Sequence, residues 1–329
     1  MNHPTLLEVR NLSVAFESDD GRLLRAVDDI SFTVGRGECL GIVGESGSGK
    51  SVAAMSLVRL LPRPAGRILS GEVMFEGEDV LKMTPSQLHE LRGGRVGVIF
   101  QEPMNALNPV HTVGDQIAES LMLHRGLTAD AAWVEAVNLL RHVHIPNPDL
   151  RALEYPGSLS GGMRQRIVIA IALACRPQLI IADEPTTALD VTVQQQILHL
   201  LRELRRDLSA SSILITHDLG VVAQNCDRVL VMYGGRVVES AEVTELFGNP
   251  RHAYTRALLA SMPRRNYERK SILPTIPGMV APIQDYVEGC RFCQRLGVPE
   301  SRLTKRYPLV EVSPGHWVES CPRCMTDII

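Results

Sequence analysis

The segment that decides the fold runs from Gly41 to Val52 and reads Gly-Ile-Val-Gly-Glu-Ser-Gly-Ser-Gly-Lys-Ser-Val. An apolar strand, Leu40 to Val43, precedes a loop that fits the pattern G-x-x-x-x-G-K-[ST], and a helical run follows it. Glycines let backbone N–H groups converge on phosphate, and the N-terminus of the next helix adds a positive dipole. The alternative is an ordinary glycine-rich turn, which the flanking strand and helix disfavour. The segment therefore predicts a nucleotide phosphate site.

Lys50 and Ser51, the last two residues of the phosphate-loop motif, have expected roles. Lys50 would bring positive charge to the β- and γ-phosphates, and Ser51 would give an oxygen to Mg2+. The residues expected to surround the nucleotide here are Gly44, Glu45, Ser46, Gly47, Ser48, Gly49, Lys50, Ser51 and Val52.

A second stretch, Leu179–Glu184, closes four apolar residues with two acids. A buried parallel strand of this kind delivers carboxylates to the C-terminal edge of a sheet. An apolar strand that ends in acids is common, but the phosphate loop upstream favours a role in nucleotide chemistry for these two. We expect Asp183 to hold Mg2+ and Glu184 to polarise the attacking water.

Short β-rich runs alternate with helical patterns up to about Ser240, which predicts an α/β fold with a mostly parallel sheet. The predicted strands are Leu7–Phe16, Leu24–Val34, Cys39–Val43, Gly71–Phe75, Arg95–Phe100, Leu179–Ala182, Ser212–Ile215, Arg228–Tyr233 and Arg236–Glu239. A hairpin is expected around Asp19-Asp20-Gly21. The predicted helices are Val113–Leu123, Ala129–Val143 and Val191–Leu208, the last with Asp190 as its N-cap.

Composition excludes several classes of protein. Of 329 residues, 45% are hydrophobic and 22% charged, which excludes disorder as the main state. The 34 basic and 37 acidic residues leave a net charge of -3, so nothing global points to nucleic acid. No apolar run approaches the ~18 residues of a membrane span, and Met1–Arg10 lacks the pattern of a signal peptide. We therefore expect a cytoplasmic protein.

A third motif makes a family resemblance specific. Leu159-Ser160-Gly161-Gly162-Met163-Arg164-Gln165 resembles the signature of ATP-binding cassette proteins and lies just before the acids of Leu179–Glu184, as in that family. Its nucleotide-contacting candidates are Ser160, Gly161, Gly162 and Gln165. The resemblance implies a P-loop NTPase cassette with a RecA-like core, an antiparallel β subdomain and an inserted α-helical subdomain. It also implies hydrolysis of ATP with Mg2+.

Three further positions match the family, each with a plainer alternative. The resemblance makes Gln101 a contact to Mg2+ and water, where a solvated loop glutamine is the alternative. It makes His217 a γ-phosphate sensor, although a lone histidine at a strand end is more often structural. It places Phe16 under adenine, whereas aromatics on edge strands usually pack. The segment Ala188-Leu189-Asp190 also fits.

The predicted domains are a nucleotide-binding domain over 1–262, containing the helical subdomain 102–158, and a C-terminal extension over 263–329. Two anion sites in one chain, at the phosphate loop and at Ser160–Gly162, suit a head-to-tail dimer. The resemblance implies that each signature closes on the ATP held by the partner's phosphate loop. The resemblance implies a second ATPase subunit, two permeases and a solute-binding protein, at the cytoplasmic face of the cell membrane.

The chain resembles most closely the ATP-binding subunits of bacterial dipeptide and oligopeptide importers. The stretches Gln101–Pro109, Asp183–Thr192 and Pro250–Leu259 carry this resemblance, with Ala253 where relatives usually have proline. Glutathione, nickel chelates and other small solutes remain open as substrates. Two alternative functions lie outside transport: a soluble cassette ATPase of translation or DNA repair, and a metal-sensing module. A chain with one compact cassette and a single phosphate loop does not fit the soluble cassette ATPases of translation or repair.

Seven cysteines do not suggest a disulfide framework. Four of them form the pattern C-x2-C-x27-C-x2-C: Cys290, Cys293, Cys321 and Cys324. Relatives carry cysteines in this region that are thought to bind an iron–sulfur cluster, but Leu296 and Leu303 stand where relatives often have cysteine. A [4Fe–4S] cluster, a structural Zn2+ and free thiols remain open. We expect Cys39, Cys175 and Cys226 to be buried small residues.

Overall fold

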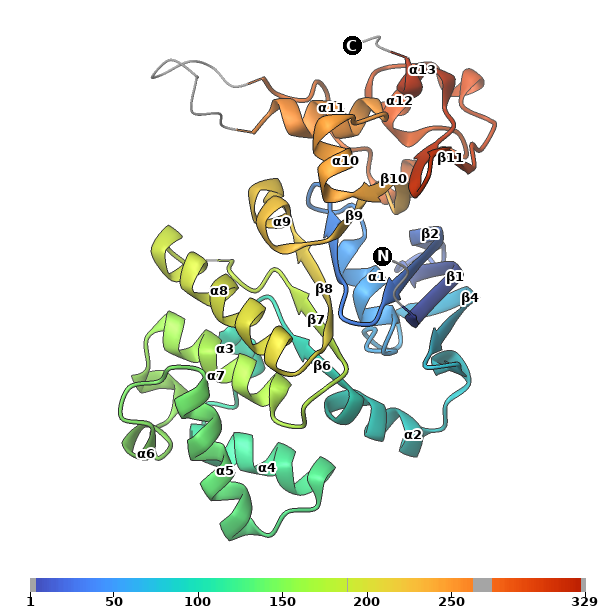
Figure 1. The fold of residues 1–329 in the computed structure, drawn as a ribbon. Coiled ribbons are helices and arrows are strands. Elements are labelled where there is room, and N and C mark those ends of the chain that lie inside the picture. Colours follow the sequence, from blue (N-terminus) through green and yellow to red (C-terminus); the bar gives the residue numbers. More distant parts are fainter. Residues whose placement is uncertain (1–3, 188, 263–273, 327–329) are drawn as a thin grey trace. The chain divides into compact units, whose positions relative to one another are not determined.

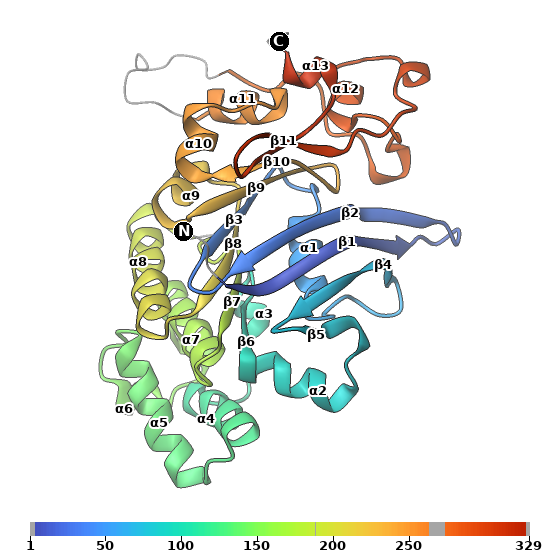
Figure 2. The ribbon, with the colours of Figure 1, turned by 45° about the vertical axis from the view of Figure 1, so that its right-hand side comes forward.

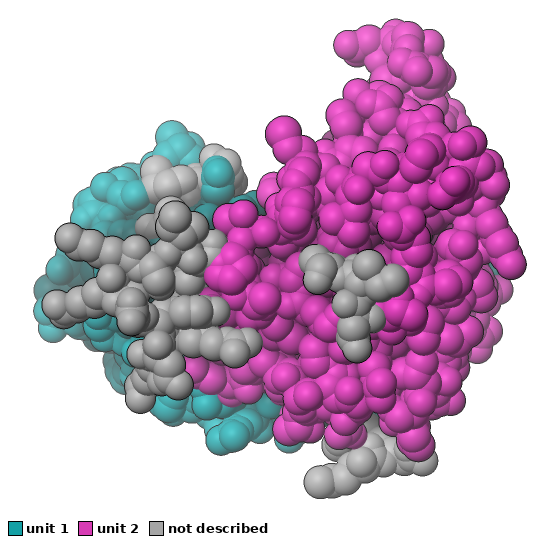
Figure 3. All heavy atoms as spheres, turned by 90° about the horizontal axis from the view of Figure 1, so that it is seen from above, with its two compact units in different colours: residues 1–7, 34–39, 75–215 teal, residues 8–33, 40–74, 216–329 magenta. Residues whose placement is uncertain are grey.

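The computed structural model describes residues 4–187, 189–262 and 274–326 (Figure 1). The chain forms two compact units, coloured separately in Figure 3, and passes between them several times along the sequence. Unit 1 holds residues 1–7, 34–39 and 75–215, and unit 2 holds residues 8–33, 40–74 and 216–329. Of the predicted extension, residues 263–273 and 327–329 lie outside the described residues, as does Ala188.

Unit 1 is built on parallel strands whose residues are almost all buried (Figure 1). They are β6 (Val96–Ile99), β7 (Leu179–Asp183) and β8 (Ser211–Thr216). Val96 pairs with Leu179, and Asp183 pairs with Ile215. Continuous apolar runs of this kind are typical of strands covered on both faces. The register brings the acid at the end of β7 to the C-terminal edge.

Helices of unit 1 begin at side-chain caps that the sequence provides. Thr112 caps α4, Thr128 caps α5 and Asp190 caps α8, each accepting a hydrogen bond from a first-turn N–H. The helices are α2 (Pro85–Glu90), α3 (Pro103–Ala106), α4 (Val113–Arg125), α5 (Ala129–His142), α6 (Pro148–Arg151), α7 (Gly161–Leu173) and α8 (Val191–Asp207). The short strand β5 (Glu78–Asp79) also lies here. Gly114 of α4 leaves room for Trp133 of α5, since an added Cβ at Gly114 would lie 2.6 Å from the Trp133 ring. The two helices therefore pack closely.

Unit 2 contains a mixed set of strands (Figure 2). β3 (Cys39–Val43) pairs in parallel with β9 (Arg228–Tyr233), and β9 pairs antiparallel with β10 (Arg236–Glu242). A separate antiparallel group has β1 (Thr5–Glu17) between β2 (Leu23–Gly35) and β4 (Gly66–Phe75). The helices are α1 (Lys50–Ser56), α9 (Leu219–Asn225), α10 (Val243–Gly248), α11 (Ala253–Ala260), α12 (Arg291–Arg295) and α13 (Pro322–Met325).

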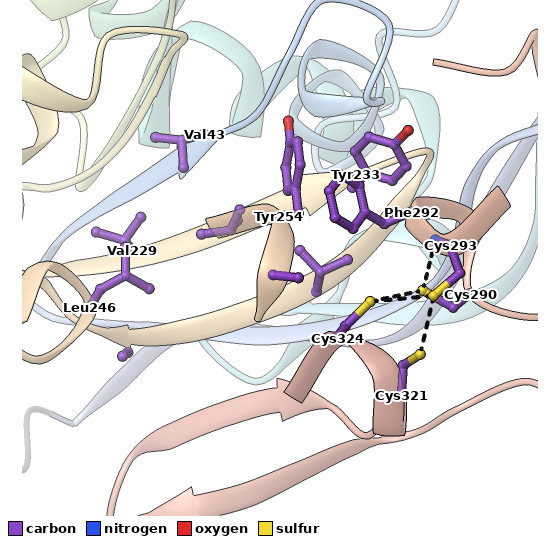
Figure 4. Close-up of a cluster of buried hydrophobic side chains, with 14 of the residues drawn as sticks. Val43, Val229, Tyr233, Leu246, Tyr254, Cys290, Phe292, Cys293, Cys321 and Cys324 are labelled. Atoms are coloured by element: carbon purple, nitrogen blue, oxygen red, sulfur yellow. Dashed lines mark hydrogen bonds between the residues drawn. The ribbon is translucent and has the colours of Figure 1, made fainter. Parts of the chain in front are cut away.

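The C-terminal residues extend the β9–β10 sheet instead of forming a detached lobe. β12 (His316–Glu319) pairs antiparallel with β10, and β11 (Leu309–Ser313) pairs with β12. Neither strand was predicted. The four cysteines of the tail belong to the same buried cluster as Val229 and Leu246 (Figure 4). The tail therefore shares a buried apolar core with β9 and α10.

A buried carboxylate also joins the tail to the rest of unit 2. Asp28 on β2 is 1% exposed and accepts hydrogen bonds from Arg236 Nε at 2.8 Å and Arg291 Nη2 at 2.7 Å. Arg306 Nη1 lies 3.1 Å from its other oxygen. Burial alone would raise the pKa of Asp28, but these guanidinium groups outweigh it and hold the pKa below its usual range. The ion pairs connect β2, β10 and α12.

The α/β class and the expected strands are confirmed, with ends that differ by a few residues. Cys39–Val43 and Arg228–Tyr233 have the predicted bounds, and the hairpin at Asp19-Asp20-Gly21 joins β1 to β2. The three predicted helices correspond to α4, α5 and α8. Within the described residues, no helix combines the length and apolar composition that crossing a bilayer requires.

Candidate nucleotide and metal sites

The phosphate loop of unit 2 has a backbone that only glycine accommodates easily at two positions. Gly44 has φ 155°, and an added Cβ would lie 2.2 Å from the Met232 carbonyl oxygen. Gly49 has φ 94°, and its Cβ would lie 2.5 Å from the Ala26 oxygen. The loop therefore lies against the neighbouring backbone.

Lys50 is 5% exposed and begins α1. Its Nζ donates to the carbonyl oxygens of Gly44 at 2.9 Å and Glu45 at 3.0 Å. These two carbonyl oxygens therefore hold the ammonium group against the backbone of the loop. Ser51 and Val52 follow in the first turn of α1 and are half-buried.

Two other predicted nucleotide contacts lie in unit 2. Phe16 is half-buried near the end of β1, and an added Cβ on Gly66 would lie 3.3 Å from its ring. His217 is exposed directly after β8, next to Asp218, which caps α9. These positions are compatible with adenine and phosphate contacts, which stay predictions.

In unit 1 the catalytic candidates Gln101 and Glu184 are in contact. Gln101 Nε2 donates to Glu184 Oε2 at 3.1 Å, and Thr187 Oγ1 donates to the same oxygen at 2.9 Å. Glu184 has φ 44°, a left-handed conformation that non-glycine residues rarely adopt. Its N–H donates to the Ile215 oxygen at 3.0 Å, which fixes this backbone. Thr187 was not predicted to take part.

Asp183 is 6% exposed at the end of β7, one residue before Glu184. A buried carboxylate at a strand end can serve as a metal ligand or accept a hydrogen bond from a metal-bound water. The structure thus brings Gln101, Asp183 and Glu184 to one edge of unit 1.

The signature residues begin α7 of unit 1. Ser160 is the N-cap and its Oγ accepts from Met163 N–H at 3.4 Å. An added Cβ on Gly162 would lie 2.9 Å from Val193 Cγ1, so glycine allows α7 to approach α8. Gln165 is only 1% exposed, whereas Ser160 and Gly161 are exposed. The accessible part of the signature is therefore the start of the helix.

The four tail cysteines meet in unit 2 (Figure 4). Their Sγ atoms all lie within 4.8 Å of one another, and each residue is buried. Separations are 3.5 Å from Cys290 to Cys324, 3.6 Å from Cys293 to Cys324 and 3.7 Å from Cys293 to Cys321. Such a group of thiols can hold a metal. Among the other cysteines, Cys39 is buried as expected, whereas Cys175 and Cys226 are only half-buried.

Two contacts to the phosphate loop were not predicted. Arg295 Nη1 lies 2.5 Å from Glu45 Oε2, and the Glu45 N–H donates to the Tyr254 hydroxyl at 2.9 Å. Both partners follow Glu45 by more than 200 residues, so no local pattern indicates them. Burial raises the pKa of Tyr254 well above its usual value, so the phenol keeps its proton.

This chain is similar to known proteins over nearly its whole length. Residues 27–187 match the ABC transporter family, and residues 238–296 match the C-terminal region of oligopeptide/dipeptide transporters. The chain is 49% identical over 312 residues to the "Probable peptide ABC transporter ATP-binding protein y4tR" of Sinorhizobium fredii, covering 94% of this chain and 93% of that protein. This chain belongs to the ABC transporter family.

Other comparisons agree with this membership. The ABC ATPase is 45% identical over 316 residues to the oligopeptide transport ATP-binding protein OppD of Bacillus subtilis, covering 96% of this chain and 88% of OppD. The solved dimeric structure of the ATP-binding cassette MJ0796, bound to ADP and Pi, gives a TM-score of 0.64 at 26% identity, over 72% of this chain and 98% of that chain. The predicted cassette fold and ATPase activity are confirmed.

Proposed function

We propose that this ABC ATPase powers the import of short peptides through partner permeases. The observation that carries the proposal is that an ABC transporter segment, 27–187, and an oligopeptide/dipeptide transporter C-terminal region, 238–296, lie in one chain. Relatives named for peptide transport match along nearly the whole length. Glutathione and nickel chelates are the alternative substrates.

The proposed chemistry assigns roles to the residues that the sequence singled out. Lys50 holds phosphate, while Ser51, Gln101 and Asp183 surround Mg2+. Glu184 polarises the attacking water, and the two hydrogen bonds to its carboxylate support this role because they orient it. Two further contacts complete the proposal: His217 at the γ-phosphate and Phe16 at adenine.

The signature would act on the ATP of a second cassette subunit, most simply in a heterodimer. Exposed Ser160 and Gly161 at the start of the 13-residue helix α7 support this role, because helix N-termini bind anions. Gln165 would support the signature from the helix interior. ATP would then join the two subunits, and hydrolysis would release them.

The helical subdomain, 102–158, offers a place for a permease to dock. A cavity of about 780 Å³ is lined by residues of α3, α4, α5 and α7 and of the segment between α3 and α4. Asp115, Glu119 and Asp130 line it together with Trp133, so it suits an amphipathic segment that carries basic side chains. Docking there would hold the ATPase at the cytoplasmic face of the membrane.

The proposed domains remain 1–262 for nucleotide binding and 263–329 for the extension. The pairing of β12 with β10 supports an extension that is structurally continuous with the cassette. We further propose that the extension binds a metal centre through its four cysteines. Their burial and mutual approach support a metal, with a [4Fe–4S] cluster and Zn2+ as the alternatives.

Isolation of the intact transporter tests the proposal. The tagged Glu184→Gln chain, which should favour the ATP-bound dimer, is purified from gently solubilised native membranes with ATP, and a matched Glu203→Gln chain is the control. We expect two permeases, a second ABC ATPase and a solute-binding protein to co-purify. Recovery of ribosomes or DNA-repair proteins instead would contradict the transport function.

Uptake by cells tests the substrate. A strain that lacks the chain should lose uptake of labelled di- and oligopeptides, and a plasmid copy should restore it. The Lys50→Ala copy should not restore it. Loss of nickel or glutathione uptake with normal peptide uptake would overturn the peptide assignment and leave the ATPase assignment intact.

A further inference from the structure

The distances between the four tail thiols distinguish the two metal centres left open above. In a tetrahedral site with Zn–S bonds of about 2.3 Å, neighbouring sulfur atoms lie about 3.8 Å apart. A four-iron cluster binds each thiolate to a different iron, which spreads the sulfur atoms to roughly 6 Å or more. The observed separations of 3.5, 3.6 and 3.7 Å match a single ion and leave no space for a cluster.

We propose that Cys290, Cys293, Cys321 and Cys324 bind one tetrahedral Zn2+ ion, in place of the iron–sulfur cluster that the family resemblance implies. This rests on the proposed metal centre and is independent of the transported substrate. Among first-row divalent ions, Zn2+ binds such sites more tightly than Fe2+ does. The pattern C-x2-C-x27-C-x2-C pairs the ligands as structural zinc sites do.

His252 lies beside the four cysteines, and we do not count it among the ligands. His252 Nδ1 accepts a hydrogen bond from Tyr254 N–H at 3.2 Å, which leaves the ring proton on Nε2. His252 is buried with one ring nitrogen within 4.8 Å of Cys290 Sγ, and its Nε2 lies 3.6 Å from Glu319 Oε2. An N–H near a metal thiolate stabilises its charge. The donor set is therefore four sulfur atoms.

The site is closed, as structural zinc sites are. All four cysteines are at most 3% exposed, and Phe292 lies beside them against Tyr233 and Tyr254 (Figure 4). Cys290 and Cys293 come from the start and middle of α12, and the other pair comes from the start and middle of α13. One ion thereby fastens α12 to α13.

Metal analysis of the full-length chain tests the proposal. The protein is purified both anaerobically and in air from medium containing iron and zinc, and zinc, iron and acid-labile sulfide are counted per chain. We expect one zinc and no sulfide under both conditions. About four irons and four sulfides in the anaerobic protein would overturn the proposal, as would one iron without sulfide, or no metal.

Cobalt substitution reports the geometry directly. Cells grown with Co2+ should yield protein with the intense visible bands of tetrahedral thiolate cobalt, and added Zn2+ should displace them. Cys321→Ser should lose or weaken the bands, whereas the half-buried Cys175→Ser, outside the site, should keep them. An octahedral cobalt spectrum of the native chain would overturn the assignment, and this result does not depend on whether Cys321→Ser folds. Bands of equal intensity in Cys321→Ser and Cys175→Ser would overturn it as well.

A separate observation concerns the phosphate loop. Glu45 is held by its side chain to Arg295 and by its backbone N–H to Tyr254, both from the C-terminal half of unit 2. The Arg295 side chain is 5% exposed and also donates to the carbonyl oxygens of Pro277 at 2.8 Å and Ile276 at 3.1 Å. The partner of Glu45 is thus itself fixed in place.

We propose that Arg295 is a positioning residue for ATP binding, acting through Glu45. The Glu45 carbonyl accepts from Lys50 Nζ, so a shift of Glu45 displaces the group expected to hold phosphate. Arg295 lies on α12, two residues after Cys293, so the metal site and the phosphate loop share a helix. The inference rests on the loop's proposed role in binding ATP, which Lys50→Ala tests separately.

Kinetics of Arg295→Gln test this role. Because the variant loses the charged hydrogen bond to Glu45, we expect the KM for ATP to rise at least about threefold, with a smaller change in kcat. Arg302→Gln, an exposed change in the same region, should leave KM unchanged. Metal content should equal that of the native chain. An unchanged KM with lowered stability would show a structural role alone and overturn the proposal.

A double-mutant cycle isolates the pair. Glu45→Gln and Arg295→Gln should each raise KM, and the double variant should resemble the single ones, because all three lack the same ion pair. Additive effects would contradict the coupling. Unchanged ATP binding by Lys50→Ala would contradict the role of the loop in binding ATP. That result is distinct from additive KM effects of Glu45→Gln and Arg295→Gln, which would contradict only the coupling of this pair.

Discussion

The Gln101 amide donates a hydrogen bond to the Glu184 carboxylate, with 3.1 Å between Nε2 and Oε2. Thr187 donates to the same oxygen, and the backbone of Glu184 is held in a left-handed conformation. Strained backbone of this kind persists where surrounding contacts determine it, and it is concentrated at functional sites. The carboxylate is therefore oriented by two donors to one of its oxygens, on a backbone that is itself fixed.

Glu184→Gln should abolish most turnover and keep ATP binding. An amide has nearly the same shape but cannot accept the proton of the attacking water, so we expect kcat to fall about 10²- to 10⁴-fold. Phosphate release and equilibrium binding of labelled ATP measure the two effects. Glu203→Gln on the exposed face of α8 is the control. Turnover near that of the native chain would refute the role of Glu184.

Lys50→Ala should weaken nucleotide binding itself. Two carbonyl oxygens hold the ammonium group within the loop, and loss of a charged hydrogen bond from it to phosphate should cost about tenfold or more in affinity. Calorimetric titration with a non-hydrolysable ATP analogue measures the loss. Lys82→Ala, whose side chain is 78% exposed, should bind normally. Unchanged affinity of Lys50→Ala would count against the phosphate loop.

The parts of the site that the sequence predicted are those encoded by local pattern. The phosphate loop, the acids at the end of β7 and the cap of α8 each need only a few neighbouring residues. β12 is different, because His-Trp-Val-Glu has no clear alternation and becomes a strand by pairing with β10. Likewise, Glu45 and Arg295 are 250 residues apart, and only the folded chain brings them together.

The two signature glycines should respond differently to alanine. At Gly161 the nearest atom to an added Cβ is 3.8 Å away, whereas at Gly162 it is Val193 Cγ1 at 2.9 Å. Valine in a helix has little rotamer freedom, so it cannot easily move aside. We expect Gly162→Ala to lower the free energy of unfolding by about 1–3 kcal/mol and Gly161→Ala to leave it unchanged or raised. Equal urea midpoints would contradict this packing.

Asp28→Asn should destabilise the protein strongly. The change leaves the buried guanidinium groups of Arg236 and Arg291 without their carboxylate, and breaking a buried ion pair from one side costs about 3–5 kcal/mol. Chemical denaturation followed by tryptophan fluorescence measures the loss. The exposed change Asp19→Asn should have no effect. A loss no greater than that of the control would show that the arginines are satisfied by other groups.

The same carboxylate gives a pH dependence with a defined sign. Because the pKa of Asp28 is lower in the folded chain than in the unfolded one, its contribution to stability is complete above the unfolded pKa of about 3.9. That contribution is lost as the pH falls through the lower, folded pKa. We therefore expect the difference in unfolding free energy between the native chain and Asp28→Asn to be constant from pH 6 to 8 and to shrink only below about pH 4. A difference that shrank above pH 5 would mean that the guanidinium groups do not lower this pKa.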